Sequence, residues 1–176
     1  VEYNAGTTIT INGTVTASGT VDIDADGVTT IAAGGDIVAD GAVTFGASKA
    51  GTLTTAGDVR TSDGDITFAN AVTLGGDVSL DTGGAAAGDI LLSSTVDMVG
   101  HDLALDAGPA GDVTLAGALS NGDVLTVVAG ADADVLFKTL SEQQQTLDDG
   151  LETAETFLPQ LVTAWRTVGA LGRTRA

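Results

Sequence analysis

Three aspartates at alternate positions are the residues of this chain most suited to metal chemistry. Asp22, Asp24 and Asp26 lie in the run DIDADG, which ends at Gly27 and matches the opening of an EF-hand calcium loop. Carboxylate oxygens at alternate positions are the hard ligands that Ca²⁺ prefers. The twelfth position of such a loop is Ala33, where an EF-hand requires a bidentate glutamate. The three carboxylates are therefore candidate calcium ligands. The alternative is a strand with Asp22 and Asp24 facing outward, followed by a turn.

Other side chains that could do chemistry are scarce. His101 is the single histidine and cysteine is absent, so we expect a solvated turn histidine rather than a zinc ligand. A polysaccharide-cleaving site requires an acid/base pair, and sugar-binding clefts are usually lined by exposed aromatic rings. Aromatic residues make up only 3% of the chain, and Phe45, Phe68 and Phe137 fall at positions that we expect to face inward. We assign no catalytic residue and predict that the protein is not an enzyme.

The charge of the chain is extreme. It carries 24 acidic and 6 basic residues, a net charge of −18, and residues 1–140 hold 19 of the acids and 3 of the bases. Nucleic acids and anionic membranes require Lys and Arg to neutralise phosphate, so we expect neither as a partner. No stretch approaches 18 consecutive apolar residues, so we expect no membrane span. The acidic surface suits weakly held calcium, and we expect no other cofactor.

The region 64–134 repeats itself three times, as 64–87, 88–110 and 111–134. Each copy opens with Gly-Asp and an alternating apolar pair, and a second pair follows about half a period later. The pairs are Ile66/Phe68 and Val78/Leu80, Ile90/Leu92 and Leu103/Leu105, and Val113/Leu115 and Val124/Thr126. Alternation with a period of two indicates a strand with one buried face. A fixed period in the twenties indicates a solenoid.

The first half follows the same pattern less strictly. Its pairs are Ile9/Ile11, Val15/Ala17, Val21/Ile23, Ile31/Ala33, Ile37/Ala39, Val43/Phe45, Leu53/Thr55 and Val59/Thr61. Short strands at this spacing could also form an antiparallel sandwich. The recurrence of Gly-Asp favours the solenoid, because a coil of three strands per turn must make the same corners in every turn. The corner aspartates, which we interpret as formers of local Asx-turns, are Asp36, Asp58, Asp65, Asp77, Asp89, Asp112 and Asp123.

The pattern changes at Ser141, a plausible helix N-cap. Apolar residues of the segment 141–176 follow helical spacing, with interruptions at Gly150 and Pro159. We therefore predict two regions. Residues 1–140 form a parallel β-solenoid of five to six turns, and residues 141–176 form a helical segment that caps the last turn or joins chains.

The stretch GDITFANAVTLGGDVSLDTG, with GDILLSSTVDMVGHDLALDAGPAGDVTLAGAL, resembles the repeats of filamentous-haemagglutinin-type adhesins and related giant bacterial surface proteins. The resemblance covers about residues 6–137. It implies a right-handed parallel β-helix, export across the outer membrane and a role as stalk or adhesive filament. It also implies an extracellular or cell-surface location and a glycan or protein receptor.

The sequence thus predicts an all-β protein, a parallel β-helix with a short α-helical C-terminal segment. Its expected function is that of an exported structural rod, an adhesin stalk or surface filament component, which associates along the solenoid axis. One alternative is a calcium-responsive extracellular matrix or surface-layer component, in which cations must neutralise the acidic faces before chains associate. The other alternative is a polysaccharide-acting β-helix enzyme.

Overall fold

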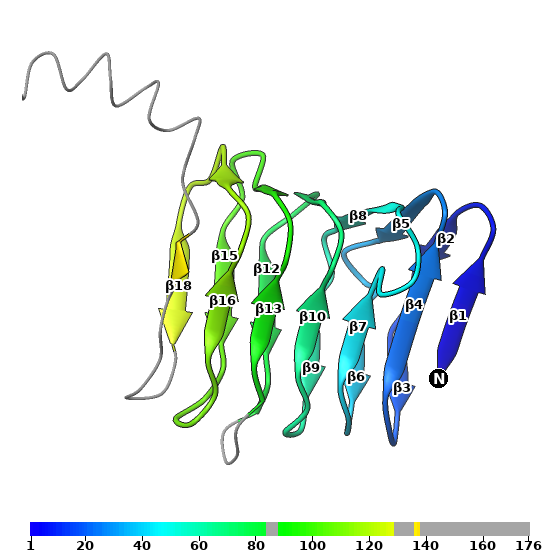
Figure 1. Ribbon diagram of the computed structural model, residues 1–176, viewed down its shortest axis with the longest axis horizontal. Helices are drawn as coiled ribbons and strands as arrows, with labels where there is room; N and C mark the ends of the chain where they lie inside the picture. Colours follow the sequence, from blue (N-terminus) through cyan, green and yellow to red (C-terminus); the bar gives the residue numbers. More distant parts are fainter. Residues whose placement is uncertain (84–87, 129–135, 138–176) are drawn as a thin grey trace, which may run out of the picture. The chain divides into compact units, whose positions relative to one another are not determined.

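A computed structural model describes residues 1–83, 88–128 and 136–137, the last two for their backbone only. In these residues the chain coils so that every third strand stacks on the same sheet (Figure 1). The first sheet contains β1 (Glu2–Ala5), β4 (Val21–Ala25), β7 (Val43–Phe45), β10 (Ile66–Phe68), β13 (Ile90–Leu92), β16 (Val113–Leu115) and β19 (Leu136–Phe137).

Two further sheets complete each turn. The second sheet contains β2 (Ile9–Ile11), β5 (Val28–Ile31), β8 (Thr52–Thr55), β11 (Val72–Leu74), β14 (Val96–Asp97) and β17 (Leu119–Ser120). The third contains β3 (Val15–Ala17), β6 (Ile37–Ala39), β9 (Val59–Thr61), β12 (Val78–Asp81), β15 (Leu103–Asp106) and β18 (Leu125–Val128). The predicted three strands per turn are confirmed.

All strand pairs are parallel, which confirms the β-solenoid and excludes the antiparallel sandwich for the described residues. The register along the first sheet advances by 20, 22, 23, 24, 23 and 22 residues per turn. The aligned pairs are Glu2/Asp22, Val21/Val43, Val43/Ile66, Ile66/Ile90, Ile90/Val113 and Thr114/Leu136. These six steps agree with the predicted five to six turns.

The core consists of columns of aliphatic side chains that run from turn to turn. The predicted inward residues Ile66, Phe68, Ile90 and Leu92 are buried, and each lies over its counterpart in the next turn. Phe45 and Phe68 meet edge to face, with ring centroids 5.0 Å apart. Because each column holds one side chain per turn, residues that are 19 (Leu53/Val72) to 25 (Val78/Leu103) positions apart form the core together.

Two predicted strand positions are wrong. Ala33 is exposed, because β5 ends at Ile31 and its inward pair is Thr29 and Ile31. In the third repeat the inward residues are Leu125 and Val127, which align with Leu103 and Leu105 of the preceding turn. The predicted pair Val124/Thr126 faces solvent instead. At Ala33 the error was the end of the strand. In β18 apolar residues lie on both faces, so alternation alone did not fix which face is buried.

One step of the coil changes register. In the third sheet, Leu80 of β12 aligns with Val59 of β9, although Val78 is the first inward residue of its strand. The strand β12 therefore begins two residues before the position that aligns with the start of β9.

Glycine is required where a corner packs against the turn before it. A Cβ atom added to Gly111 would overlap the carbonyl oxygens of Gly88 and Ala107, and one added to Gly88 would overlap that of Gly64. These are the glycines of the Gly-Asp corners. Val99 is a different case, because it adopts φ of 51° although it is β-branched and 51% exposed, a backbone conformation that disfavours its side chain. The helical segment predicted for residues 141–176 lies outside the described residues.

The alternation of the strands can be tested by truncating one residue on each face. Replacing the buried Ile90 by Ala removes contacts from a closed column and should lower the free energy of unfolding by about 2–4 kcal/mol. Thr67→Ala, on the outward face of the neighbouring strand, should change it by less than about 0.5 kcal/mol. Urea denaturation of both variants measures the difference, and equal losses would contradict the register.

Candidate functional site

The three candidate calcium ligands lie on one strand and its corner, but they have different surroundings. Asp24 is buried beneath the loop between β7 and β8, where its carboxylate accepts a hydrogen bond from the backbone N–H of Ser48 (3.2 Å) and a second from the Ser48 hydroxyl. Asp26, at the following corner, forms an ion pair with Lys49 (3.0 Å). Neighbouring residues of one loop, Ser48 and Lys49, thus bind both carboxylates.

Asp22 lacks such partners. Its Oδ1 atom is buried and has no hydrogen-bond partner among the described residues. Partial burial, and then the neighbouring carboxylates of Asp24 and Glu2, raise the pKa of Asp22 above its usual value. The register places Glu2 directly beside Asp22 on the adjacent strand, so two carboxylates face the same side of the sheet.

The described residues contain no group of three or more His, Asp or Glu side chains arranged to hold a metal ion. Asp22, Asp24 and Asp26 are therefore close in sequence but do not converge as a coordination shell. Calcium binding there stays a prediction.

In the described part of the chain, no helix is long and apolar enough to cross a membrane.

The Gly-Asp corners have a structural role that the sequence did not reveal. At five of the seven corners, the carboxylate accepts a hydrogen bond from a backbone N–H of the following turn rather than from its own turn. The bonds run from Asp58 N–H to Asp36 (3.0 Å), Asp89 to Asp65 (2.9 Å), Asp102 to Asp77 (3.0 Å) and Asp112 to Asp89 (2.9 Å). We call these corner carboxylates the aspartate ladder.

The ladder explains the Gly-Asp dipeptide. The strand residue after each corner donates its N–H to the next turn, as Ile66 does to the carbonyl of Asp89 (2.8 Å). The N–H of Asp89 points toward the preceding turn, where it donates a hydrogen bond to the carboxylate of Asp65. Where β12 changes register, Asp58 bonds the N–H of Ser79 instead (2.8 Å). The ladder thus follows the register of the backbone.

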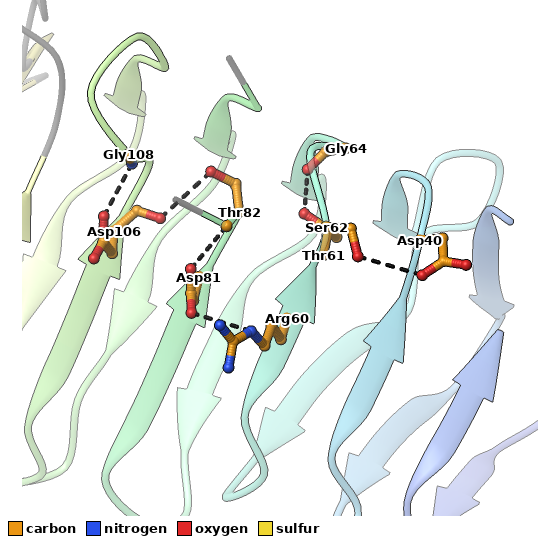
Figure 2. Close-up of polar contacts among 10 residues, drawn as sticks. Asp40, Arg60, Thr61, Ser62, Gly64, Asp81, Thr82, Asp106 and Gly108 are labelled. Carbon is orange, nitrogen blue, oxygen red and sulfur yellow. Dashed lines mark hydrogen bonds and ion pairs between the residues drawn. The ribbon is translucent and has the colours of Figure 1, made fainter. Parts of the chain in front are cut away.

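Local Asx-turns do occur, but at the carboxyl ends of strands. Gly83 donates to Asp81 (2.7 Å), and Gly108 donates to Asp106 (2.9 Å). Figure 2 shows these strand ends in the third sheet, where the Nε atom of Arg60 lies 3.3 Å from the carboxylate of Asp81. Our interpretation of the Gly-Asp aspartates as Asx-turn formers was therefore wrong, because their bonding partners lie one turn away.

The buried threonine hydroxyls at these strand ends also have hydrogen-bond partners. The hydroxyl of Thr82, whose side chain is fully buried, donates to the carbonyl of Gly88 (3.0 Å). Thr61, also buried, donates to the carbonyl of Gly64 (Figure 2). These threonines occupy inward positions where other turns have alanine, and their hydroxyls hold the corner backbone. Their chemistry is therefore structural.

A groove of about 340 Å³ lies on the outer face of the third sheet. Its rim carries the ladder carboxylates of Asp58, Asp77 and Asp102, and its floor includes Ala104 and the half-exposed Val124. The groove is open and acidic.

The basic residues in the described part are paired with this acidic surface. Lys49 lies on Asp26 and Arg60 on Asp81. His101 lies at a corner with its Nδ1 atom 3.6 Å from Asp77, and its side chain is 36% exposed. This agrees with the predicted turn position. Most carboxylates of the outer surface have no basic partner in the described residues.

In comparisons with family models, with curated proteins and with solved structures, nothing matches this chain. The β-solenoid itself is shown by the strand pairing. The resemblance to filamentous-haemagglutinin-type adhesins receives no support from these comparisons.

The ladder predicts a difference between two aspartates of equal charge. Asp89→Ala removes the acceptor of the Asp112 N–H and should lower the free energy of unfolding by roughly 1 kcal/mol. Asp89→Asn keeps an acceptor oxygen and removes a like charge, so its stability should equal or exceed that of the wild type. Asp63→Ala is the control, because Asp63 is exposed and accepts no hydrogen bond within the described residues. Equal effects of the two alanine variants in urea denaturation would exclude the ladder as a stabilising feature.

Asp22 and Asp24 should respond to neutralisation with opposite signs. Because the folded state raises the pKa of Asp22, its ionised form destabilises the fold at pH 7, and this penalty disappears below the ordinary pKa of about 3.8. Asp22→Asn should therefore raise the melting temperature at pH 7, with a gain that vanishes near pH 3.5. Asp24→Asn should lower it, because the bonds from Ser48 lose a charged acceptor. Melting curves at several pH values test both, and a loss of stability in Asp22→Asn at pH 7 would contradict the assignment.

Proposed function

We propose that the protein is a structural rod, exported to the cell surface, where it serves as an adhesin stalk or as a component of a surface filament. One observation carries this proposal. The corner aspartates that recur from Asp36 onward form hydrogen bonds between turns, as the pair Asp65 and Asp89 does. A chain whose repeated chemistry holds successive turns together is suited to bearing load or to spacing other parts along its axis.

The surface supports the same role. The acidic outer faces favour solubility and keep neighbouring rods apart at low ionic strength. The groove of the third sheet, with its carboxylate rim and the exposed Val124, is the surface we assign to a glycan or protein receptor. An adhesive stalk would present such a surface at a fixed distance from the cell.

A second candidate function is a calcium-responsive matrix or surface-layer component. It is favoured by the charge of residues 1–140, which hold 19 acids and 3 bases. Ladder carboxylates such as Asp77 and Asp102 use one oxygen for a backbone bond, and the other is free to meet a cation between rods.

Location tests the first proposal directly. Cells that produce the protein should carry it on their surface or release it into the medium. Immunogold labelling of intact cells, together with fractionation, should detect it there. An exclusively cytoplasmic signal would refute an exported rod, whatever the protein does in solution.

Association in salt separates the two candidates. Screening of the acidic faces should make association increase gradually with ionic strength, because charges then repel over roughly 3 Å at about 1 M salt instead of 10 Å at about 0.1 M. Calcium and a monovalent salt of matched ionic strength should then act similarly in light scattering. A sharp, stoichiometric calcium transition that also raises the melting temperature would favour the calcium-responsive component. Loss of that transition in Asp24→Asn would place the site at the DIDADG run.

A further inference from the structure

The corner between β2 and β3 contains a tripeptide of the type that receives N-linked sugars. Residues 12–14 read Asn-Gly-Thr. An asparagine followed by any residue except proline, and then by serine or threonine, is the acceptor motif for N-glycosylation. The chain has four asparagines, and Asn12 is the one with a hydroxyl residue two positions on. The other three have Gly6, Val72 and Asp123 at that distance.

The alternation of the strand turns the acceptor side chain outward. Ile11, the last residue of β2, is buried in the core. Successive side chains of a strand point to opposite faces, so the side chain of Asn12 leaves the solenoid sideways. Thr14 directly precedes Val15, which packs against the core as the first residue of β3. Both Asn12 and Thr14 are accordingly exposed.

This exposure does not depend on the place of the corner in the first turn. The register aligns Ile11, through β5, with Thr55 at the end of β8. Position 12 therefore corresponds to Ala56, and position 14 corresponds to Asp58, in an inner corner of the same length. Turns lie on both sides of that corner, yet Ala56 is partly exposed and Asp58 is exposed. Side chains at these two positions therefore reach solvent in the interior of the solenoid as well.

The strands hold both ends of the tripeptide in place. The carbonyl of Ile11 accepts a hydrogen bond from the N–H of Ala32 (2.9 Å), and the N–H of Val15 donates to the carbonyl of Asp36 (2.8 Å). The three residues between them belong to no strand. An enzyme can therefore reach this corner without opening the sheets, as it reaches surface loops on other rigid scaffolds.

We propose that Asn12 is an acceptor for an N-linked sugar. This modification goes beyond the proposed function, on which it rests for one premise, that the chain meets a glycosyltransferase on its way to the cell surface. The hydroxyl of Thr14 is the group that distinguishes this asparagine from the other three. The attached sugar would be a bulky, solubilising group on the outside of the solenoid.

The transfer needs a sugar that is activated as a phosphate or pyrophosphate ester, together with the transferase. The side-chain amide nitrogen of Asn12 forms a bond to the anomeric carbon of that sugar. The bond from this carbon to the phosphate oxygen breaks, and the phosphate leaves with the electron pair. One proton of the amide passes to a base of the transferase. No oxidant or reductant takes part.

Mass spectrometry of the full-length chain, recovered from the cells that naturally produce it, tests the proposal. The peptide that contains Asn12 should carry the added mass of one or more sugar residues. Asn12→Gln and Thr14→Ala should abolish this addition, whereas Thr14→Ser keeps the hydroxyl and should retain it. All three variants should melt at the temperature of the wild type, because both side chains face outward.

Asn121 provides a matched control within the same chain. It is also exposed at a corner and is also followed by glycine, but Asp123 stands where the motif requires a hydroxyl. Its peptide should therefore carry no sugar in the same sample. This comparison separates recognition of the motif from a reaction that any exposed Asn-Gly pair would undergo.

Several outcomes would overturn the inference. Protein from the cell surface in which Asn12 is unmodified, or is converted to aspartate without added sugar, would do so while leaving the exported rod intact. Sugar that persists in Thr14→Ala, or that appears on Asn121, would exclude recognition through the motif. A chain found exclusively in the cytoplasm and without sugar would refute both proposals, and immunogold labelling reports that location independently.

Discussion

The backbone of a coiled β-sheet needs a hydrogen-bond partner at every corner, and the rest of this structure follows from how that need is met. Along the strands, parallel ladders pair the backbone groups of adjacent turns. At the corners the ladder ends, and an N–H such as that of Asp112 would remain unpaired. The carboxylate of Asp89 accepts it from one turn away. Glycine precedes these aspartates because a Cβ atom there would overlap the backbone of the neighbouring turn.

This solution adds to the acidic charge of the protein. Each turn that uses aspartate at its corners adds carboxylates to a column in which they lie about 4.8 Å apart, the ordinary strand spacing. Because one oxygen of each bonds the backbone, the column tolerates like charges that would otherwise repel one another. The sides of the solenoid are consequently acidic. The first turn, with Glu2 as its single acid, is the exception.

The surface and the ends therefore have different chemistry. The sides carry oriented carboxylates and a shallow groove with Asp77 and Asp102 at its rim. In the first turn Tyr3 is 38% exposed, and Glu2 is the single acid of residues 1–20. The acidic sides of neighbouring copies repel one another at low ionic strength. This contrast is the physical basis for treating the protein as a structural element.

The sequence by itself determined the parallel solenoid, the number of turns and most of the buried positions, because period-two alternation and the recurrent Gly-Asp corners are local patterns. Ile66 and Phe68 could be assigned inward on that ground. Only the tertiary structure decided which residues meet across turns. The bond from Asp89 N–H to Asp65, and the two-residue shift that aligns Leu80 with Val59, join residues more than twenty positions apart. Such pairs depend on the lengths of the intervening corners, which local patterns do not specify.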